Sequence, residues 1–465
     1  MIEKLGEKIT FLFLKFMPSA FVFAILLTII TAIGAYVWLD TTPMKIITSW
    51  YDGFFDLLGF AMQIVLIIIT GFSIALSPII KRGIDSFTRH INSPTQVYFL
   101  VVLIGLILTL ISFGWVVITC VLARELALRV KGVHYPFLIG CVYISSGSWV
   151  SGLSSSIPLL LNTKNNFLIN SGVLSEVIPT SYTLGSILNI VMIITTLIVV
   201  PLILVILRPR KTSNKEISDL IIAKENSNTQ TIKEEALSQK LPFKSYSDNL
   251  NNSFILQMII VVMGLVYIVY HFSTNGFDLS FNIMIFIFII VGLLLHKTPM
   301  RYVISMKKAS SNISGILFQY PFYAGIMGIM LYTGLGEKLG QILAAQASIN
   351  SYPFLAYLTG AFVNFAIPSA GGEFAVVGPS IINAVKEIGT GLPTEEITEM
   401  IARASLSVAY GESLSNLLQP FYLLLVLPIM ASGIKIQARD IMGYLVLPFV
   451  ILFIIQSILV SFCPF

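Results

Sequence analysis

The chain has 465 residues, of which 56% are apolar and only 11% are Asp, Glu, Lys or Arg. Soluble proteins are about 45–50% apolar and about 25% charged, so this composition excludes an ordinary soluble enzyme and a disordered protein. The net charge is +5, and the basic residues lie in short loops between apolar runs rather than in a nucleic-acid-binding patch. We therefore expect an integral membrane protein.

Seven apolar runs are long enough to predict membrane-spanning helices, which need about 20 apolar residues. They are residues 17–38, 54–77, 187–208, 254–272, 281–296, 312–333 and 440–461. The first run follows Lys4, Lys8 and Lys15 and contains no small-residue cleavage site. We therefore expect a retained helix at this position and not a signal peptide.

Four further apolar stretches are interrupted near their middles by Gly, Ser, Asn or Pro: 97–130, 136–162, 352–388 and 401–432. Backbone breaks at membrane depth are tolerated only where protein or a water-filled cavity supplies hydrogen-bond partners. We interpret 97–130 and 352–388 as re-entrant hairpins. We interpret 136–162 and 401–432 as broken helices that cross the membrane.

This interpretation gives nine crossings, and the basic residues support it. With the N-terminus inside, 23 of the 28 Lys and Arg residues face the cytoplasm and 5 face outward. Such an excess is what the positive-inside rule favours. We therefore predict a multi-pass protein of the cytoplasmic (inner) membrane with its C-terminus outside.

The order of predicted elements repeats. Two spans, a hairpin, a broken helix and a span fill residues 1–208, and the same order fills 281–461. Between them lie a polar segment, 209–253, which we interpret as a cytoplasmic tether with a short helix at 216–238, and a connecting span, 254–272. Five crossings precede the second unit, so it is predicted to be inverted. The predicted fold class is an all-α polytopic membrane protein with two inverted repeats, an architecture typical of secondary transporters.

Several motifs lie in order across the chain. They are 293–300 (LLLHKTPM), 320–326 (YPFYAGI), 364–369 (NFAIPS) with Gly371 and Gly372, 409–412 (AYGE), 419–421 (QPF) and 439–444 (RDIMGY). These stretches resemble the short-chain fatty acid transporter family, the acetoacetate and butyrate uptake carriers. The resemblance implies uptake of short monocarboxylates coupled to a cation. It also implies a homodimer, two hairpins and an elevator-type motion.

The interrupted regions are predicted to bind a carboxylate without a basic side chain. The windows 105–122, 140–160, 360–380 and 405–425 contain no Lys, Arg or His. A carboxylate there must be bound by free backbone N–H groups and by neutral polar side chains. The candidate substrate-binding residues are Ser112, Gly114, Ser146, Ser148, Asn364, Ser369, Gly371, Gly372, Ser413 and Asn416.

Four aromatic residues of these windows, Phe113, Trp115, Trp149 and Phe374, are candidates for the wall around a short alkyl tail. The alternative is that the Gly and Ser residues only allow close helix packing in lipid.

Two acidic residues, Glu373 and Glu412, lie in the same windows. An ionised side chain at the bilayer centre costs about 2.5–3.5 kcal/mol, so both are candidates for function. A bound Na⁺ or proton would remove their repulsion of an anionic substrate. We therefore predict an ion-coupling role and cation symport, with no other cofactor. The alternatives are a structural cap at a half-helix start for Glu412 and a water-exposed hairpin edge for Glu373.

Other function classes are less favoured or stay open. An intramembrane enzyme is disfavoured because Ser151 has no His base at membrane depth and the sequence has no HExxH motif. Three widely separated cysteines, Cys120, Cys141 and Cys463, favour neither a disulfide framework nor a zinc site. An anion channel stays open, as does a carrier for a dicarboxylate, citrate or a peptide-like acid. Arg124, Glu125, Arg129 and Lys131 are expected at the cytoplasmic face, and the alternative for them is an ion-pair latch.

Overall fold

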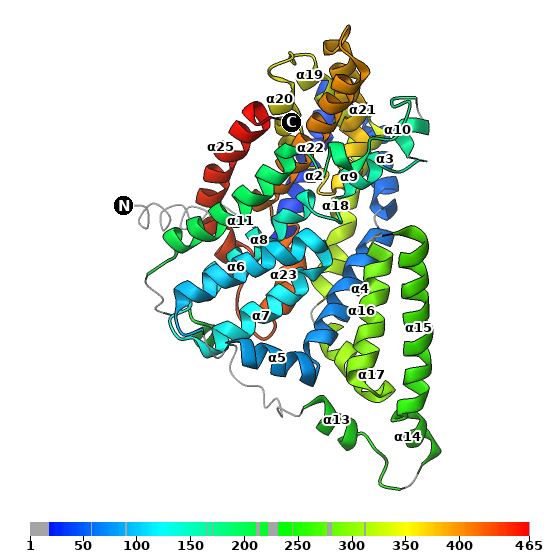
Figure 1. The fold of residues 1–465 in the computed structure, drawn as a ribbon, viewed down its shortest axis with the longest axis vertical. Helices are drawn as coiled ribbons and strands as arrows, with labels where there is room; N and C mark the ends of the chain where they lie inside the picture. The colour runs from blue at the N-terminus through cyan, green and yellow to red at the C-terminus, as the bar shows by residue number, and fades with distance from the viewer. Residues whose placement is uncertain are drawn as a thin grey trace.

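The computed structural model describes residues 18–56, 58–88, 91–164, 166–170, 172–210, 214–221, 231–243, 245–276, 281–310 and 313–464. Within these ranges the regular structure is helical, apart from one isolated bridge between Ile221 and Ile434. This confirms the prediction of an all-α protein (Figure 1). The N-terminal lysines used in the topology prediction, and Phe465, lie outside the described residues.

The helices of the first predicted unit are α2 (Ala20–Leu39), α3 (Pro43–Asp56), α4 (Leu58–Ala75), α5 (Pro78–Thr88), α6 (Pro94–Ile111), α7 (Val116–Arg129), α8 (Tyr135–Ser145), α9 (Ser156–Leu161), α10 (Phe167–Asn170) and α11 (Ile187–Leu207). Short 3₁₀ turns occur at η1 (Phe113–Trp115), η2 (Ser146–Ser151) and η3 (Thr180–Tyr182). Local sequence explains several helix starts. Ser93 caps α6 in a reciprocal pair with Gln96, and Pro94 occupies the first helical position, where a missing N–H costs nothing.

The linker and second unit contain α12 (Ile217–Leu220), α13 (Ile232–Ser238), α14 (Tyr246–Asn251), α15 (Phe254–Asn275), α16 (Phe281–His296), α17 (Pro299–Ala309), α18 (Ser314–Tyr332), α19 (Leu335–Ala344), α20 (Tyr352–Val363), α21 (Ala370–Ile388), α22 (Thr394–Ser415), α23 (Leu423–Met430), α24 (Arg439–Met442) and α25 (Val446–Phe462). Two 3₁₀ turns, η5 (Asn416–Leu418) and η6 (Gly443–Leu445), lie in the same unit. The predicted single helix at 216–238 is instead the two short helices α12 and α13, and the residues between them lie outside the described ranges.

Six described helices are long and apolar enough to cross a membrane: Phe21–Leu39, Pro94–Ile111, Tyr135–Leu161, Ile187–Leu207, Tyr246–Asn275 and Arg439–Phe462. A seventh is the pair Thr394–Leu418 and Leu423–Met430, which is bent by 49° at a short break. This pair is the stretch predicted as the second broken helix. The runs predicted at 54–77, 281–296 and 312–333 correspond to α3 with α4, α16 and α18, which do not meet the same criterion. The nine-crossing topology stays a prediction.

Helix packing is reciprocal between the two units. Helix α18 packs on α2 and α3, and its counterpart α4 packs on α16 and α17. The second hairpin arm α7 packs on α23, and its counterpart α21 packs on α9. Hairpin arm α6 packs on η2, and hairpin arm α20 packs on α22. Each of these contacts in one unit therefore has an equivalent contact in which the elements of 1–208 and 281–461 change places. Two related units would produce this arrangement.

The described parts of the linker contact the rest of the protein. The backbone N–H of Tyr135 donates to Lys215 O (2.9 Å), and that of Lys435 donates to Leu220 O (2.9 Å). Helix α13 packs on α17, where Lys308 pairs with Glu235. The interpretation of 209–253 as a plain tether therefore misses three attachment points.

Candidate functional site

The predicted hairpins contain breaks at the expected positions. In the first hairpin, Ser112 has extended backbone (φ −155°, ψ 133°) between α6 and the 3₁₀ turn η1. In the second, residues 364–369 separate α20 from α21. The N–H of Phe113 donates to Ser154 Oγ (3.1 Å), so the first hairpin break contacts the break of the first broken helix.

The second broken helix is interrupted later than predicted. Helix α22 continues through Gly411 and Glu412 to Ser415, and the break follows at residues 416–422. Gly411 lies against the backbone of α20, because a Cβ at this position would overlap the carbonyl oxygen of Tyr357. The glycine is thus required for close helix packing and not for a break. Glu412 is therefore not a cap at a half-helix start.

A small cavity lies between the breaks of the first hairpin and the two broken helices. Its lining residues are Phe113, Tyr143, Ser146, Gly147, Trp149, Ser413, Asn416, Leu417 and Tyr422. The cavity has a volume of about 10 Å³. That is about the minimum for one water molecule, so the cavity has no room for a short acid in this structure.

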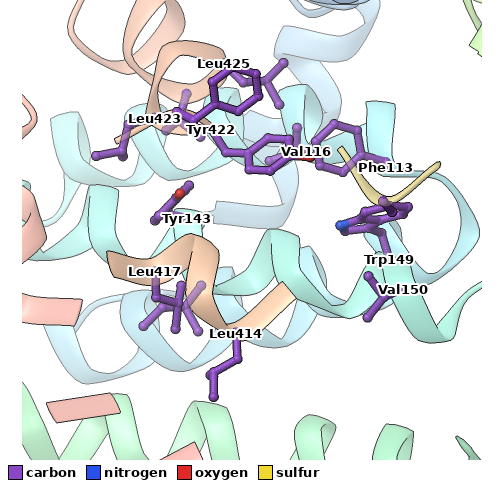
Figure 2. Close-up of a cluster of buried hydrophobic side chains, with 14 of the residues drawn as sticks. Phe113, Val116, Tyr143, Trp149, Val150, Leu414, Leu417, Tyr422, Leu423 and Leu425 are labelled. Atoms are coloured by element: carbon purple, nitrogen blue, oxygen red, sulfur yellow. The ribbon is translucent and has the colours of Figure 1, made fainter. Parts of the chain in front are cut away.

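One wall of the cavity is aromatic. The ring of Phe113 lies 5.5 Å from the ring of Trp149 and 5.6 Å from the ring of Tyr422, in edge-to-face geometry (Figure 2). Phe113 and Trp149 were predicted for this wall. Tyr143 and Tyr422 were missed, although both lie inside the windows without basic residues, because a tyrosine there is equally typical of the bilayer interface.

The other two predicted wall residues lie elsewhere. Trp115 packs against a separate cluster formed by Ile74, Met284 and Phe288. Phe374 is fully buried and lies against Gly378 in its own helix. Neither lines the cavity, so their place in an alkyl wall stays a prediction.

Three of the ten predicted substrate-binding residues, Ser146, Ser413 and Asn416, line the cavity. Ser146 Oγ donates to Tyr143 O (2.6 Å), and Ser413 Oγ donates to Gly147 O (2.7 Å). The second bond joins the two broken helices across the cavity.

The structure does not bring the other seven to the cavity. Ser148 hydrogen-bonds to Thr109 (2.8 Å), and a Cβ at Gly114 would lie 3.0 Å from Ile67, so these two support packing. The remaining five are Ser112 at the first hairpin break and Asn364, Ser369, Gly371 and Gly372 at the second. The second hairpin break is linked to the cavity through Tyr422, whose hydroxyl donates to Pro368 O (3.1 Å).

An amide network joins the second hairpin break to the last turn of α22. Asn364 Nδ2 donates to Ser415 Oγ (2.7 Å), to Asn416 Oδ1 (2.8 Å) and to Glu412 O (3.1 Å). Gln419 Nε2 donates to the same Asn416 Oδ1 (2.9 Å). Asn364 and Gln419 are both fully buried. Gln419 was absent from the predicted site residues, although it belongs to the QPF motif.

The two predicted coupling residues are brought together. Glu373 and Glu412 are each 0% exposed, so Glu373 is not at a water-exposed edge. No oxygen of either carboxyl group has a hydrogen-bond partner in the described part of the chain. The two groups are close enough to interact electrostatically. Helix α21 supplies one and α22 the other.

Two basic residues after the first hairpin form hydrogen bonds within the protein. Arg124 donates to Ile429 O (2.7 Å) and Ser432 O (2.8 Å), and so caps the C-terminal end of α23. Arg129 donates to Thr88 Oγ1 (2.8 Å). The prediction of simple interfacial side chains was therefore incomplete for both arginines.

Comparison with known proteins assigns the family. The profile of the short chain fatty acid transporter family matches residues 1–463. The chain belongs to this family. A relative from Haemophilus influenzae, provisionally named short-chain fatty acid transporter, is 33% identical over 449 residues, and one of the same name from Escherichia coli is 34% identical over 445. Each alignment covers 96% of both chains.

Two solved structures are more distant. The YdaH transporter of Alcanivorax borkumensis is 16% identical with a TM-score of 0.43, covering 96% of this chain and 98% of its own. MtrF of Neisseria gonorrhoeae, described with a class of antimetabolite efflux pumps, is 14% identical with a TM-score of 0.37, covering 96% and 95%. The family, and not these distant structures, gives the function. The chain is a membrane transporter for a small organic anion and not an enzyme.

Proposed function

We propose that this protein is a secondary carrier that takes up short monocarboxylates such as acetoacetate and butyrate by cation symport. The observation that carries the proposal is the small cavity between the two broken helices. Its lining combines an aromatic wall with neutral polar groups and includes no Lys, Arg or His. A small acid with a short alkyl tail matches both parts of this lining, whereas a dicarboxylate would place a second charge against aromatic rings.

The buried pair Glu373 and Glu412 is the proposed coupling site. Two unpaired carboxylates at this depth repel each other and any nearby anion, so a proton or Na⁺ between them stabilises the loaded state. The C-terminal end of α22 connects the two sites, because Glu412 interacts electrostatically with Glu373 while Ser413 and the C-cap residue Asn416 line the cavity. Occupancy of one site is thereby linked to the other through a single helical turn.

The proposed architecture is two inverted repeats with re-entrant hairpins and an elevator-type motion in a homodimer of the inner membrane. Reciprocal packing between the two units supports the repeat. The hairpins and broken helices pack on one another through α7 with α23 and α21 with α9, and would move as one body.

Uptake into proteoliposomes tests the function. Labelled butyrate and acetoacetate are offered with an inward Na⁺ gradient, an inward proton gradient, or neither. We expect saturable uptake and accumulation above equilibrium with one of the two gradients. Protein-free liposomes are the control, because protonated short acids cross lipid unaided.

Two results would contradict the proposal. Uptake that rises linearly with concentration would indicate a channel. Transport of dicarboxylates with no transport of butyrate or acetoacetate would exclude the proposed substrate class.

A further inference from the structure

We infer that the substrate carboxylate is bound by two uncharged N–H donors, Nδ2 of Asn416 and Nε1 of Trp149, and that Asn364 and Gln419 orient the Asn416 amide for this role. The inference rests on the proposed function, since it assigns the polar half of the same cavity. In this assignment Asn416 and Trp149 touch the substrate, whereas Asn364 and Gln419 position Asn416.

The hydroxyl groups around the cavity already donate to the protein. Tyr143 donates to Asn416 O (2.6 Å) and Gln419 O (3.1 Å), and Tyr422 donates to Pro368 O (3.1 Å). Ser146 and Ser413 donate to the carbonyls of Tyr143 and Gly147. A hydroxyl has one hydrogen, so none of these four groups is free to donate to a carboxylate in this state.

Two side-chain donors on the cavity lining remain. Asn416 Nδ2 and Trp149 Nε1 both belong to lining residues, and neither donates to an acceptor among the residues that the structure describes. Neither atom is among the fully enclosed polar atoms. In Figure 2 the indole nitrogen of Trp149 lies on the side of its ring toward Tyr143 and Leu417, two other residues of the lining.

The orientation of the Asn416 amide follows from its oxygen. Oδ1 accepts one hydrogen bond from Asn364 Nδ2 (2.8 Å) and one from Gln419 Nε2 (2.9 Å). Rotating the amide by 180° would replace both bonds with contacts between two donors. The two bonds therefore direct the oxygen of Asn416 toward the network and leave its NH₂ group for the ligand. An asparagine without these partners could turn either end toward the ligand.

The chemistry of this pair suits a transported monoanion. Uncharged N–H donors bind a carboxylate through charge-assisted hydrogen bonds, and they leave no buried positive charge when the site empties. They also discriminate by hydrogen-bond polarity, because a carboxylate offers an acceptor oxygen to each donor whereas an amide offers one oxygen and places its NH₂ group against the second donor. Butyrate and butyramide have nearly the same size and differ in this property and in charge.

The experiment measures competition by butyrate and by butyramide against labelled butyrate counterflow in proteoliposomes. Wild type should prefer the acid. Trp149→Phe keeps an aromatic ring and removes the N–H, and Asn416→Asp replaces donors with acceptors. We expect each to raise the KM for butyrate at least tenfold with a smaller change in maximal rate, and Asn416→Asp to lower the acid-to-amide preference at least tenfold.

The positioning residues are tested by Gln419→Glu and Asn364→Asp, which remove the donors to Asn416 Oδ1 and allow the amide to turn. Both should lower the acid-to-amide preference while butyrate transport persists. Ser405→Ala is the matched control, because it removes a buried hydroxyl from α22 whose one hydrogen bond within the described ranges goes to Ile401 O (2.8 Å). It should leave the preference unchanged.

The outcomes separate this inference from the proposed function. If wild type transports no short monocarboxylate, the proposed function is wrong. If wild type transports butyrate and both Trp149→Phe and Gln419→Glu keep its KM and its acid-to-amide preference, the donor pair is wrong while the function stands. Should the charged substitutions fail to fold in size-exclusion chromatography, Trp149→Phe decides by its KM.

Discussion

Glu373 on α21 and Glu412 on α22 are both fully buried acidic residues. Their rarity among apolar residues is visible in the sequence, because ionisable groups at membrane depth are costly. Their proximity is not, since the two acids belong to different helices and only the packing of α21 on α22 brings them together. The fully buried state of both carboxyl groups makes a charge-compensating ion a chemical requirement of any ionised form.

Substituting one acid separates exchange from accumulation. Glu412→Gln mimics the protonated form, so substrate exchange should persist while gradient-driven accumulation fails if protons couple transport. If Na⁺ is the coupling ion, the variant should lose most of its sodium dependence. Counterflow and gradient-driven uptake are measured on the same preparation. Glu387→Gln, at an exposed position of α21, is the control, and full accumulation by Glu412→Gln would make Glu412 structural and direct attention to Glu373.

Two glycines that look alike in sequence should respond differently to substitution. A Cβ at Gly411 would overlap Tyr357 O, whereas the nearest atom to a Cβ at Gly371 is Ser156 Cβ at 4.0 Å. Gly411→Ala should therefore lower the free energy of unfolding by about 1–3 kcal/mol. Gly371→Val should fold with nearly unchanged thermal stability, yet lose transport because the hairpin tip is predicted to approach the substrate. Normal transport by Gly371→Val at matched expression would show that the hairpin tip is not part of the substrate site.

At the scale of helices, the sequence predicts that breaks exist, but it predicts the position of the first hairpin break better than that of the second broken helix. The first hairpin break falls at Ser112, as expected. The second broken helix continues past its Tyr-Gly-Glu motif. A glycine permits both a break and a close helix contact, and only the backbone of α20, some fifty residues earlier, decides between them.

The same reason limits prediction of the site. Ser146, Ser413 and Asn416 reach the cavity, whereas Ser148, of the same type and in the same turn as Ser146, bonds to α6. Side-chain direction within a broken segment depends on the local turn geometry. Residue type and the windows without basic residues could therefore identify the region of the site, but not which side chains line the cavity.

The start of α8 provides a pH-dependent prediction. His134 is the N-cap of α8, and its Nδ1 accepts from the N–H of Phe137 (3.3 Å). Burial, with a smaller contribution from Lys215, lowers the pKa of His134 from 6.5 to about 4. The unfolded chain therefore binds a proton that the folded chain does not between pH 6.5 and 4. Folding stability should fall as the pH decreases through this window, by at most about 3 kcal/mol.

Thermal unfolding in detergent at pH 7 and pH 5 measures this effect. His134→Asn keeps a good N-cap and does not titrate, so it should lose a smaller part of its stability at pH 5 than wild type. Equal losses in the two proteins would show that other groups, and not the α8 cap, determine the acid sensitivity.

For the whole molecule, two independent observations support a pair of related units. The sequence repeats its order of spans and interruptions, and the structure repeats its helix contacts under exchange of the two units. The linker attachments to α8, to the segment after α23 and to α17 were not predictable, because backbone hydrogen bonds such as Tyr135 N to Lys215 O leave no pattern in side chains.

The orientation of the units in the membrane is tested by labelling single cysteines. The three native cysteines are replaced first, including Cys463, which is partly exposed near the predicted outer end of the chain. One cysteine is then placed at Ser227 in the linker, which lies outside the described residues, or at Thr394, the exposed first residue of α22. The distribution of basic residues predicts that a membrane-impermeant maleimide labels position 394 in intact cells and labels position 227 only after permeabilisation. Labelling of position 227 in intact cells would place the linker outside, reverse the direction of both hairpins and contradict the nine-crossing topology.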